Sequence, residues 1–184
     1  APEDRARELH LCHAYLEIGL DREAAERIEG LLEKDGQVPA EVALEFTFLL
    51  GEIRSRQGDP RAARRSFEKL ARLDPEDARG LVRRSYVVLL DAYRAKGDAA
   101  DVKRIASEFR RKYDDDATRA LADWYVLRTL VDPLLAAQAK NPGAVKKAVP
   151  AVKKEIEDHL REYPASPKAK ELRDLLGARP FAGS

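Results

Sequence analysis

The only close group of soft metal ligands in the sequence consists of His10, Cys12 and His13. At a spacing of three residues, His10 and His13 share one face of a helix, whereas Cys12 points away from that face. We therefore expect neither a metal site nor a cofactor. Free cysteine is commonly buried, so Cys12 is expected to pack in the core. His159 has no such neighbours and is expected to be a partly exposed helical residue.

Catalytic signatures are missing from the sequence. It contains no G-x-S-x-G motif, no P-loop and no dinucleotide-binding fingerprint. The carboxylates are spread along expected helices, where they can pair with Arg or Lys four residues away. A general acid or base needs a pocket that shifts its pKa, and no polar residues converge on one. We predict that the protein is not an enzyme and has no catalytic residues.

Basic side chains form three runs that could contact phosphates. Phosphate binding needs an excess of positive charge on one face, yet the chain balances 34 Lys and Arg against 33 Asp and Glu, a net charge of +1. Acidic residues also interrupt the runs. We expect a solvated outer surface, and RNA binding is kept as an alternative. The runs are Arg61, Arg64, Arg65, Lys69 and Arg72; Lys103, Arg104, Arg110, Arg111 and Lys112; and Lys146, Lys147, Lys153 and Lys154.

The elements that must position these residues are helices, and the clearest signal covers residues 50–75. Apolar residues recur at helical spacing before Gly58, which ends the first helix of a predicted helix–turn–helix unit. Asp59 can cap the second helix, and Pro60 suits its first position because no N–H is needed there. The small residues Gly51 and Ala63 on the inner faces would let the two helices approach closely.

The same unit recurs along the chain. Gly19, Gly58 and Gly97 lie 39 residues apart, and apolar residues match at the same offset. This repetition predicts regular helical hairpins at 3–36, 39–74 and 75–113. The expected helices cover residues 3–18, 21–34, 39–57, 59–73, 76–96 and 99–112. The second of these is expected to close at Gly36.

The spacing becomes irregular after residue 113. Three consecutive Asp residues at 114–116 can cap a seventh helix, which Pro133 should kink or end. A turn at 141–143 precedes a helix from Pro150 to Glu162, and Ser166 is expected to cap a last helix that ends near residue 176. We predict one helical domain over 1–177, in which residues 114–177 cap the regular hairpins or act as a lid. Residues 178–184 are expected to be a frayed tail.

Composition sets further limits. The chain has 184 residues, of which 44% are hydrophobic and 36% charged, as is typical of a soluble helical protein. No apolar run is long enough for a transmembrane segment. A single cysteine excludes an internal disulfide. Because the chain begins with Ala and contains no Met, we expect a mature or excised form and leave its compartment open.

Residues 50–75 resemble the tetratricopeptide repeat. The family pattern of Leu-Gly, then Ala-x3-Phe, then Pro is matched by Leu50-Gly51, Ala63-x3-Phe67 and Pro75. Thr47 and Arg54 stand where the pattern prefers Trp and Tyr. Weaker copies extend the resemblance over residues 4–114. It implies an all-α fold, a right-handed superhelical array of antiparallel helix pairs with about nine helices in total.

A second resemblance concerns the compartment. Residues 163–166, Tyr-Pro-Ala-Ser, are similar to a phrase of bacterial envelope tetratricopeptide proteins, in which the helix stops at Tyr-Pro and Ser caps the next one. An earlier copy after Phe109 has Asp114 in place of the Pro. This resemblance implies a bacterial periplasmic or cell-envelope location, with the cytoplasm as the alternative.

The tetratricopeptide resemblance also implies a binding groove. In that family, exposed residues of the first helix of each hairpin line a concave surface that takes a peptide or helix of a partner. An apolar floor that includes Leu9, Phe48 and Val87, surrounded by charges of both signs, suits an amphipathic segment. For Phe48, packing against a neighbouring helix is an equally open interpretation. The groove residues carried over are His13, Glu17, Glu45, Phe48, Glu52, Arg56, Arg84, Val87, Asp91 and Arg94.

These inferences lead to one functional prediction. We expect a non-catalytic scaffold or adaptor that binds another protein, in a bacterial envelope assembly if the second resemblance holds. Two alternatives remain. One is an RNA-binding helical-repeat protein, and the other is an architectural protein that associates with copies of itself.

Overall fold

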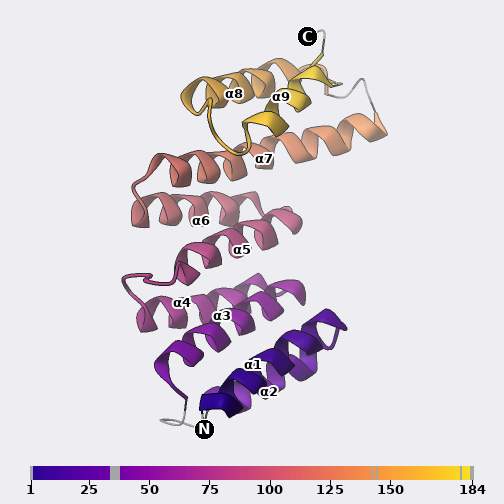
Figure 1. The fold of residues 1–184 in the computed structure, drawn as a ribbon. Coiled ribbons are helices and arrows are strands. Elements are labelled where there is room, and N and C mark those ends of the chain that lie inside the picture. The colour runs from indigo at the N-terminus through magenta and orange to yellow at the C-terminus, as the bar shows by residue number, and fades with distance from the viewer. Residues whose placement is uncertain (1, 34–37, 142, 144, 179, 183–184) are drawn as a thin grey trace. The chain divides into compact units, whose positions relative to one another are not determined.

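The computed structural model describes residues 2–33, 38–141, 143, 145–178 and 180–182, and in these ranges the chain forms nine α-helices and no β-strand (Figure 1). The all-α class and the expected number of helices are therefore confirmed. Gly36 and Pro142, at which the sequence predicts a helix end and a turn, lie outside the described residues. The helices are α1 Pro2–Glu17, α2 Asp21–Leu32, α3 Ala40–Arg56, α4 Pro60–Leu73, α5 Leu81–Ala95, α6 Ala99–Lys112, α7 Asp116–Lys140, α8 Val149–Glu162 and α9 Ala169–Gly177.

The chain divides into two compact units, Ala1–Ala92 and Tyr93–Ser184. Unit 1 contains α1 to α4 and most of α5, and unit 2 contains the end of α5 and α6 to α9. The division falls inside α5, whereas the sequence predicts the change from regular hairpins to capping helices at residue 114. A single repeat domain over residues 1–177 stays a prediction.

The start of α4 follows the local chemistry of its sequence. Gly58 has a φ of +76°, a conformation that suits glycine, and the chain reverses there between α3 and α4. The Asp59 side chain then accepts a hydrogen bond from the Ala62 backbone N–H at 2.9 Å, and Pro60 occupies the first turn. The predicted turn, cap and first residue of the helix are all confirmed.

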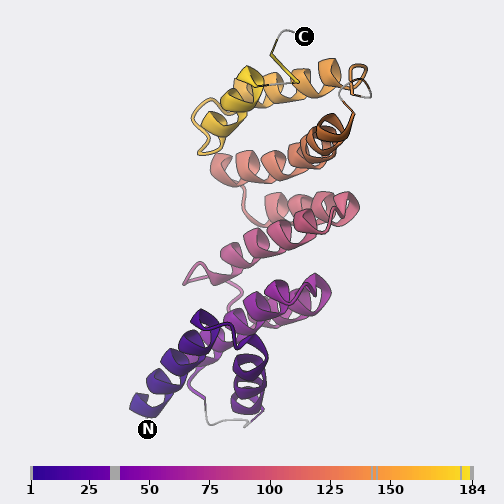
Figure 2. The ribbon, with the colours of Figure 1, turned by 90° about the vertical axis from the view of Figure 1, so that its right-hand side faces the viewer.

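Unit 1 is built by close packing of α3 on α4, with α2 on α3 and α1 on both α2 and α3 (Figures 1 and 2). Gly51 of α3 permits the closest approach, because a Cβ atom there would lie 2.2 Å from the Phe67 ring of α4. Cys12 of α1, Ile28 of α2 and Phe46 of α3 are fully buried together in one apolar cluster. The predicted close approach at Gly51 and the packing role of Cys12 are confirmed.

Helix α5 begins at Leu81, five residues later than the sequence predicts. Asp77 has a φ of +51°, which is incompatible with a helix, and Gly80 has a φ of +69°. The Asp77 carboxylate accepts hydrogen bonds from the backbone N–H groups of Val82 at 2.8 Å and Arg83 at 2.9 Å. The predicted start at residue 76 is wrong because Asp77 satisfies the first free N–H groups of α5 from a turn outside it.

In unit 2, α6 packs on α7, α7 on α8 and α8 on α9 (Figure 1). Asp98 and Asp115 cap α6 and α7 by accepting hydrogen bonds from the Asp101 and Thr118 N–H groups, at 3.0 Å and 2.9 Å. Helix α7 continues through Pro133 to Lys140, so of the two predicted effects of this proline, a kink or an end, the helix does not end there. Its neighbours Val131 and Leu134 are buried, and this packing offsets the backbone hydrogen bond that a proline removes.

The C-terminal segment also differs from the prediction. Ser166 accepts a hydrogen bond from the Lys168 N–H at 3.2 Å, but α9 begins only at Ala169, so Ser166 closes a turn before the helix. Phe181 is fully buried, and its N–H donates to the Ala178 carbonyl at 3.0 Å. The predicted frayed tail is therefore wrong at Phe181, which packs in the core.

Candidate functional site

The predicted groove residues lie on α1, α3 and α5, and most of them reach solvent. Exposed side chains are those of His13, Glu17, Arg56, Arg84 and Asp91. Partly exposed side chains are those of Glu45, Glu52, Val87 and Arg94. The same helices bury their opposite faces, as expected for amphipathic helices that pack on their neighbours.

Phe48 is the exception, because only 3% of it is exposed. Its ring packs on Phe67 of α4, with the ring centroids 5.7 Å apart, and the Arg84 guanidinium covers it at 4.6 Å from the ring centroid. Leu9, the first residue of the predicted apolar floor, packs against the core of unit 1. Of the two interpretations left open for Phe48, packing against a neighbouring helix is confirmed and an exposed floor is wrong, since the close approach of α3 and α4 draws its ring into the interior.

The charged groove residues Glu45 and Arg94 have oppositely charged partners within their own units. Glu45 lies 3.5 Å from Arg79, on the loop that precedes α5. Arg94 belongs to unit 2, where its Nε donates to Asp132 at 2.7 Å and its guanidinium lies 5.1 Å from the Trp124 ring. The other nine groove residues belong to unit 1. The ten residues therefore do not form a surface within one unit.

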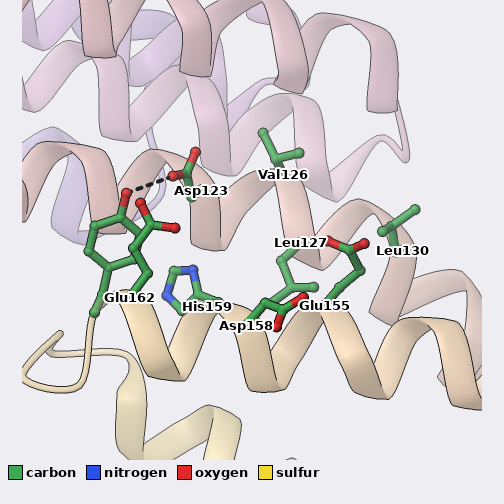
Figure 3. A pocket seen from close by; sticks show the side chains of 9 residues that line it. Asp123, Val126, Leu127, Leu130, Glu155, Asp158, His159 and Glu162 are labelled. Carbon is green, nitrogen blue, oxygen red and sulfur yellow. Dashed lines mark hydrogen bonds between the residues drawn. The ribbon is translucent and has the colours of Figure 1, made fainter.

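A different site lies between α7 and α8, and we call it the α7–α8 seam (Figure 3). Each helix contributes four residues at positions i, i+3, i+4 and i+7, which is one face of a helix. The cavity has a volume of about 220 Å³. The seam is lined by Asp123, Val126, Leu127 and Leu130 of α7, by Glu155, Asp158, His159 and Glu162 of α8, and by Tyr163.

The two walls of the seam differ in chemistry. The α7 wall is largely apolar, and Leu130 is unusual among large apolar side chains in being 42% exposed. The α8 wall is acidic and carries no Lys or Arg in the lining. In Figure 3, Asp123, His159 and Glu162 gather at one end of the seam, and Leu130 and Glu155 lie at the other.

The acidic charge of the seam is only partly balanced. Asp123 pairs with Arg110 of α6, and Asp158 pairs with Arg161 at 2.8 Å. Within the described part of the chain, neither Glu155 nor Glu162 pairs with a Lys or Arg. The seam therefore keeps a negative potential, which favours cations.

Tyr163 closes the acidic end of the seam. Its hydroxyl donates a hydrogen bond to Asp123 Oδ2 at 3.1 Å. Burial, together with the nearby carboxylates of Glu162 and Asp123, raises the pKa of Tyr163 far above its ordinary value. The hydroxyl therefore stays protonated and acts as a hydrogen-bond donor, not as a base.

His159 is the buried polar residue of the seam, with only 7% of it exposed. Its ring lies 5.1 Å from that of Tyr163, and its Nε2 has no hydrogen-bond partner. Burial lowers the pKa of His159, against the opposing influence of Asp123 and Glu162, so the imidazole is neutral near pH 7. The prediction of a partly exposed, isolated histidine is wrong, because α7 covers this face of α8.

Metal binding finds no support in the geometry. Across the ranges described above, no three His, Cys, Asp or Glu side chains are placed to share a metal ion. His10 and His13 are exposed, while Cys12 is buried on another face of α1.

Among the described residues, no helix has the length and apolar character needed to cross a bilayer.

A second polar cluster in unit 2 surrounds the single Trp. Lys168 and the guanidinium groups of Arg94 and Arg128 lie 4.3, 5.1 and 5.8 Å from the Trp124 ring centroid. Glu171 accepts from Arg128 at 3.1 Å. These contacts tie the first turn of α9 to α7 and mainly hold unit 2 together.

The seam is not evident from the sequence. The acidic i, i+3 and i+7 positions of α8 are visible in the sequence as Glu155, Asp158 and Glu162. The apolar positions on α7 look like ordinary core residues, and only the packing of α7 against α8 leaves Leu130 open to solvent. In the sequence, Tyr163 stands out only as part of a helix-ending phrase.

The chain was compared with known proteins in three ways. No protein-family model, no curated protein and no solved structure matches it.

Proposed function

We propose that this protein is a non-catalytic scaffold of tetratricopeptide type that binds a segment of another protein through the exposed face of α1, α3 and α5. The observation that carries the proposal is the two-sided character of these helices. Phe46, Ile53 and Leu90 are almost completely buried, whereas Arg56, Arg84 and Asp91 on the same helices are exposed. Packed helices that present mixed charges suit recognition of a protein segment.

The burial of Phe48 changes the mechanism that the sequence suggests. With this ring inside, the exposed face offers mainly charged groups, with Val87 as a partly exposed apolar contact. Charges of both signs then set the register and orientation of the partner, while apolar contacts at the centre supply affinity. The superhelical arrangement, the capping role of residues 114–177 and a bacterial envelope location belong to this proposal and rest on the two sequence resemblances.

RNA binding is less well supported than protein binding. Several Arg side chains of the basic runs are engaged by carboxylates: Arg64 bonds Glu68 at 2.8 Å, and Arg104 pairs with both Asp101 and Glu108. Such pairs reduce the positive charge available to phosphates. Self-association is the other alternative and is decided by the mass of the protein in solution.

The test is an affinity capture from an extract of the source organism with two matched double variants. Arg56→Glu and Arg84→Glu reverse two exposed charges of the proposed face, and Arg61→Glu and Arg72→Glu reverse two exposed charges of α4. We expect a protein captured by the unmodified chain to be retained by the α4 variant and lost by the face variant. Equal capture by both variants, or recovery of RNA in place of protein, would contradict the proposal.

A further inference from the structure

The α7–α8 seam combines two properties that together define an occupant. One wall is apolar and ends in the exposed side chain of Leu130, while the other carries carboxylates at successive turns of α8. Two of these carboxylates, Glu155 and Glu162, have no cationic partner among the described residues. A bound group must therefore offer positive charge on one side and apolar surface on the other.

A second, independent observation comes from His159. The residue is more than nine-tenths buried, lines the seam and leaves Nε2 without a hydrogen-bond partner. A buried polar atom without a partner costs free energy, and a ligand can recover that cost. In the neutral tautomer that carries its proton on Nδ1, Nε2 accepts a hydrogen bond, and an ammonium or guanidinium group donates one.

We propose that the α7–α8 seam binds a basic amphipathic segment of a partner protein, with a Lys or Arg side chain inserted beside Asp123, His159 and Glu162 and an aliphatic side chain resting on Leu130. The inference rests on the proposed function, a scaffold for other proteins, and assigns the chemistry of a partner at a surface separate from α1, α3 and α5.

The dimensions of the seam fit such an occupant. Asp123 and Leu130 are separated by seven residues, which is about two helical turns or roughly 10 Å along α7. Lys or Arg and an aliphatic residue seven positions later on a partner helix span the same distance. The cavity of about 220 Å³ is too small for a folded partner but admits one long side chain.

The experiment uses the full chain and a fluorescein-labelled helical peptide of about four turns that carries Lys on one face and Leu beside it. Its counterpart has Glu at every Lys position. Fluorescence polarisation at physiological salt measures both. We expect saturable binding of the Lys peptide and none of the Glu peptide.

Two variants test the location. Glu155→Gln with Glu162→Gln neutralises the seam, and Glu157→Gln with Asp174→Asn removes the same charge from exposed positions elsewhere on α8 and α9. The seam variant should weaken binding about tenfold, while the control changes it by less than about twofold. Leu130→Ala should also weaken binding, whereas Leu73→Ala, at an exposed leucine of unit 1, should not.

Three outcomes would overturn the inference. They are equal weakening by the seam and control variants, absence of saturable binding, and self-association that only the seam variant abolishes, which would make a second copy of the chain the occupant. Each is distinguishable from failure of the proposed function, because the capture experiment depends on Arg56 and Arg84 of unit 1 and leaves the seam unchanged.

Discussion

Replacing Gly51 with alanine tests the packing of α3 on α4 directly. The added Cβ would lie 2.2, 2.5 and 2.7 Å from three atoms of the Phe67 ring, well inside van der Waals contact. Overpacking of this kind costs about 2 to 3 kcal/mol, and the better helix propensity of alanine returns about 1 kcal/mol. We therefore expect Gly51→Ala to lower the free energy of unfolding by about 1 to 2 kcal/mol.

Gly30→Ala is the matched control, because Gly30 lies within α2, is exposed, and has room for a methyl group. A Cβ atom added there would meet nothing within 4 Å apart from its own helix backbone and chain neighbours. Without a clash, this change should stabilise the protein by roughly 0.5 to 1 kcal/mol. Urea denaturation followed by circular dichroism at the helix band measures both variants. Equal stabilisation by the two changes would refute the argument for close packing at Gly51.

A double-mutant cycle identifies the Phe67 ring as the cause. Phe67→Leu alone should destabilise the protein, because the ring is buried against Phe48 and Gly51. In this background the shorter side chain leaves room for the new methyl group, so Gly51→Ala should cost less than it does alone. Strict additivity of the two changes would show that the cost at Gly51 arises elsewhere.

Three further predictions concern titratable side chains. Burial raises the pKa of Cys12, so a thiol reagent should modify it slowly in the folded protein and rapidly after denaturation. The pKa of Tyr163 is raised, so ultraviolet titration of Tyr163→Phe should lack a tyrosine that ionises well above pH 10.0. Burial lowers the pKa of His159 from 6.5, so just below that pH the unfolded chain binds more protons than the folded chain. The free energy of unfolding should therefore fall as the pH is lowered through this range, and it should fall less steeply in His159→Gln.

Each of these measurements has a contrary outcome. Rapid modification of native Cys12 would show that α1 opens readily. If the unmodified protein and Tyr163→Phe gave the same ultraviolet titration at high pH, Tyr163 would be in contact with solvent. If the free energy of unfolding falls equally steeply below pH 6.5 in the unmodified protein and in His159→Gln, the acid sensitivity comes from the carboxylates and not from the imidazole.

Local features of the fold were predictable because their causes lie within a few residues. Asp59 and Asp115 cap the helices that follow them, as the sequence predicts. The start of α5 was not predicted from the same signals, because the residues before Gly80 have ordinary helical propensity, while Asp77 and Gly80 both adopt a positive φ that delays the helix. Pro133 shows the opposite case, since burial of its neighbours holds α7 together across a residue that normally ends helices.

The candidate sites were harder to predict because they depend on contacts between helices. The repeat pattern places Phe48 on an exposed face, but the absence of a side chain at Gly51 lets the Phe67 ring come close enough to cover it. His159 has no distinguishing neighbour in the sequence, and its burial follows from packing against α7, a separate helix earlier in the chain. Periodicity identifies a helix face, and packing decides whether that face is buried.

Carboxyl footprinting of the chain with and without a captured partner shows which face of the protein the partner covers. A water-soluble carbodiimide labels exposed carboxylates, and mass spectrometry locates the labels. We expect the partner to protect Glu17, Glu52 and Asp91 of α1, α3 and α5, while Glu68 of α4 and Glu76 keep their labels. Protection of Glu68 and Glu76 with unchanged labelling of the other three would show that the partner binds elsewhere.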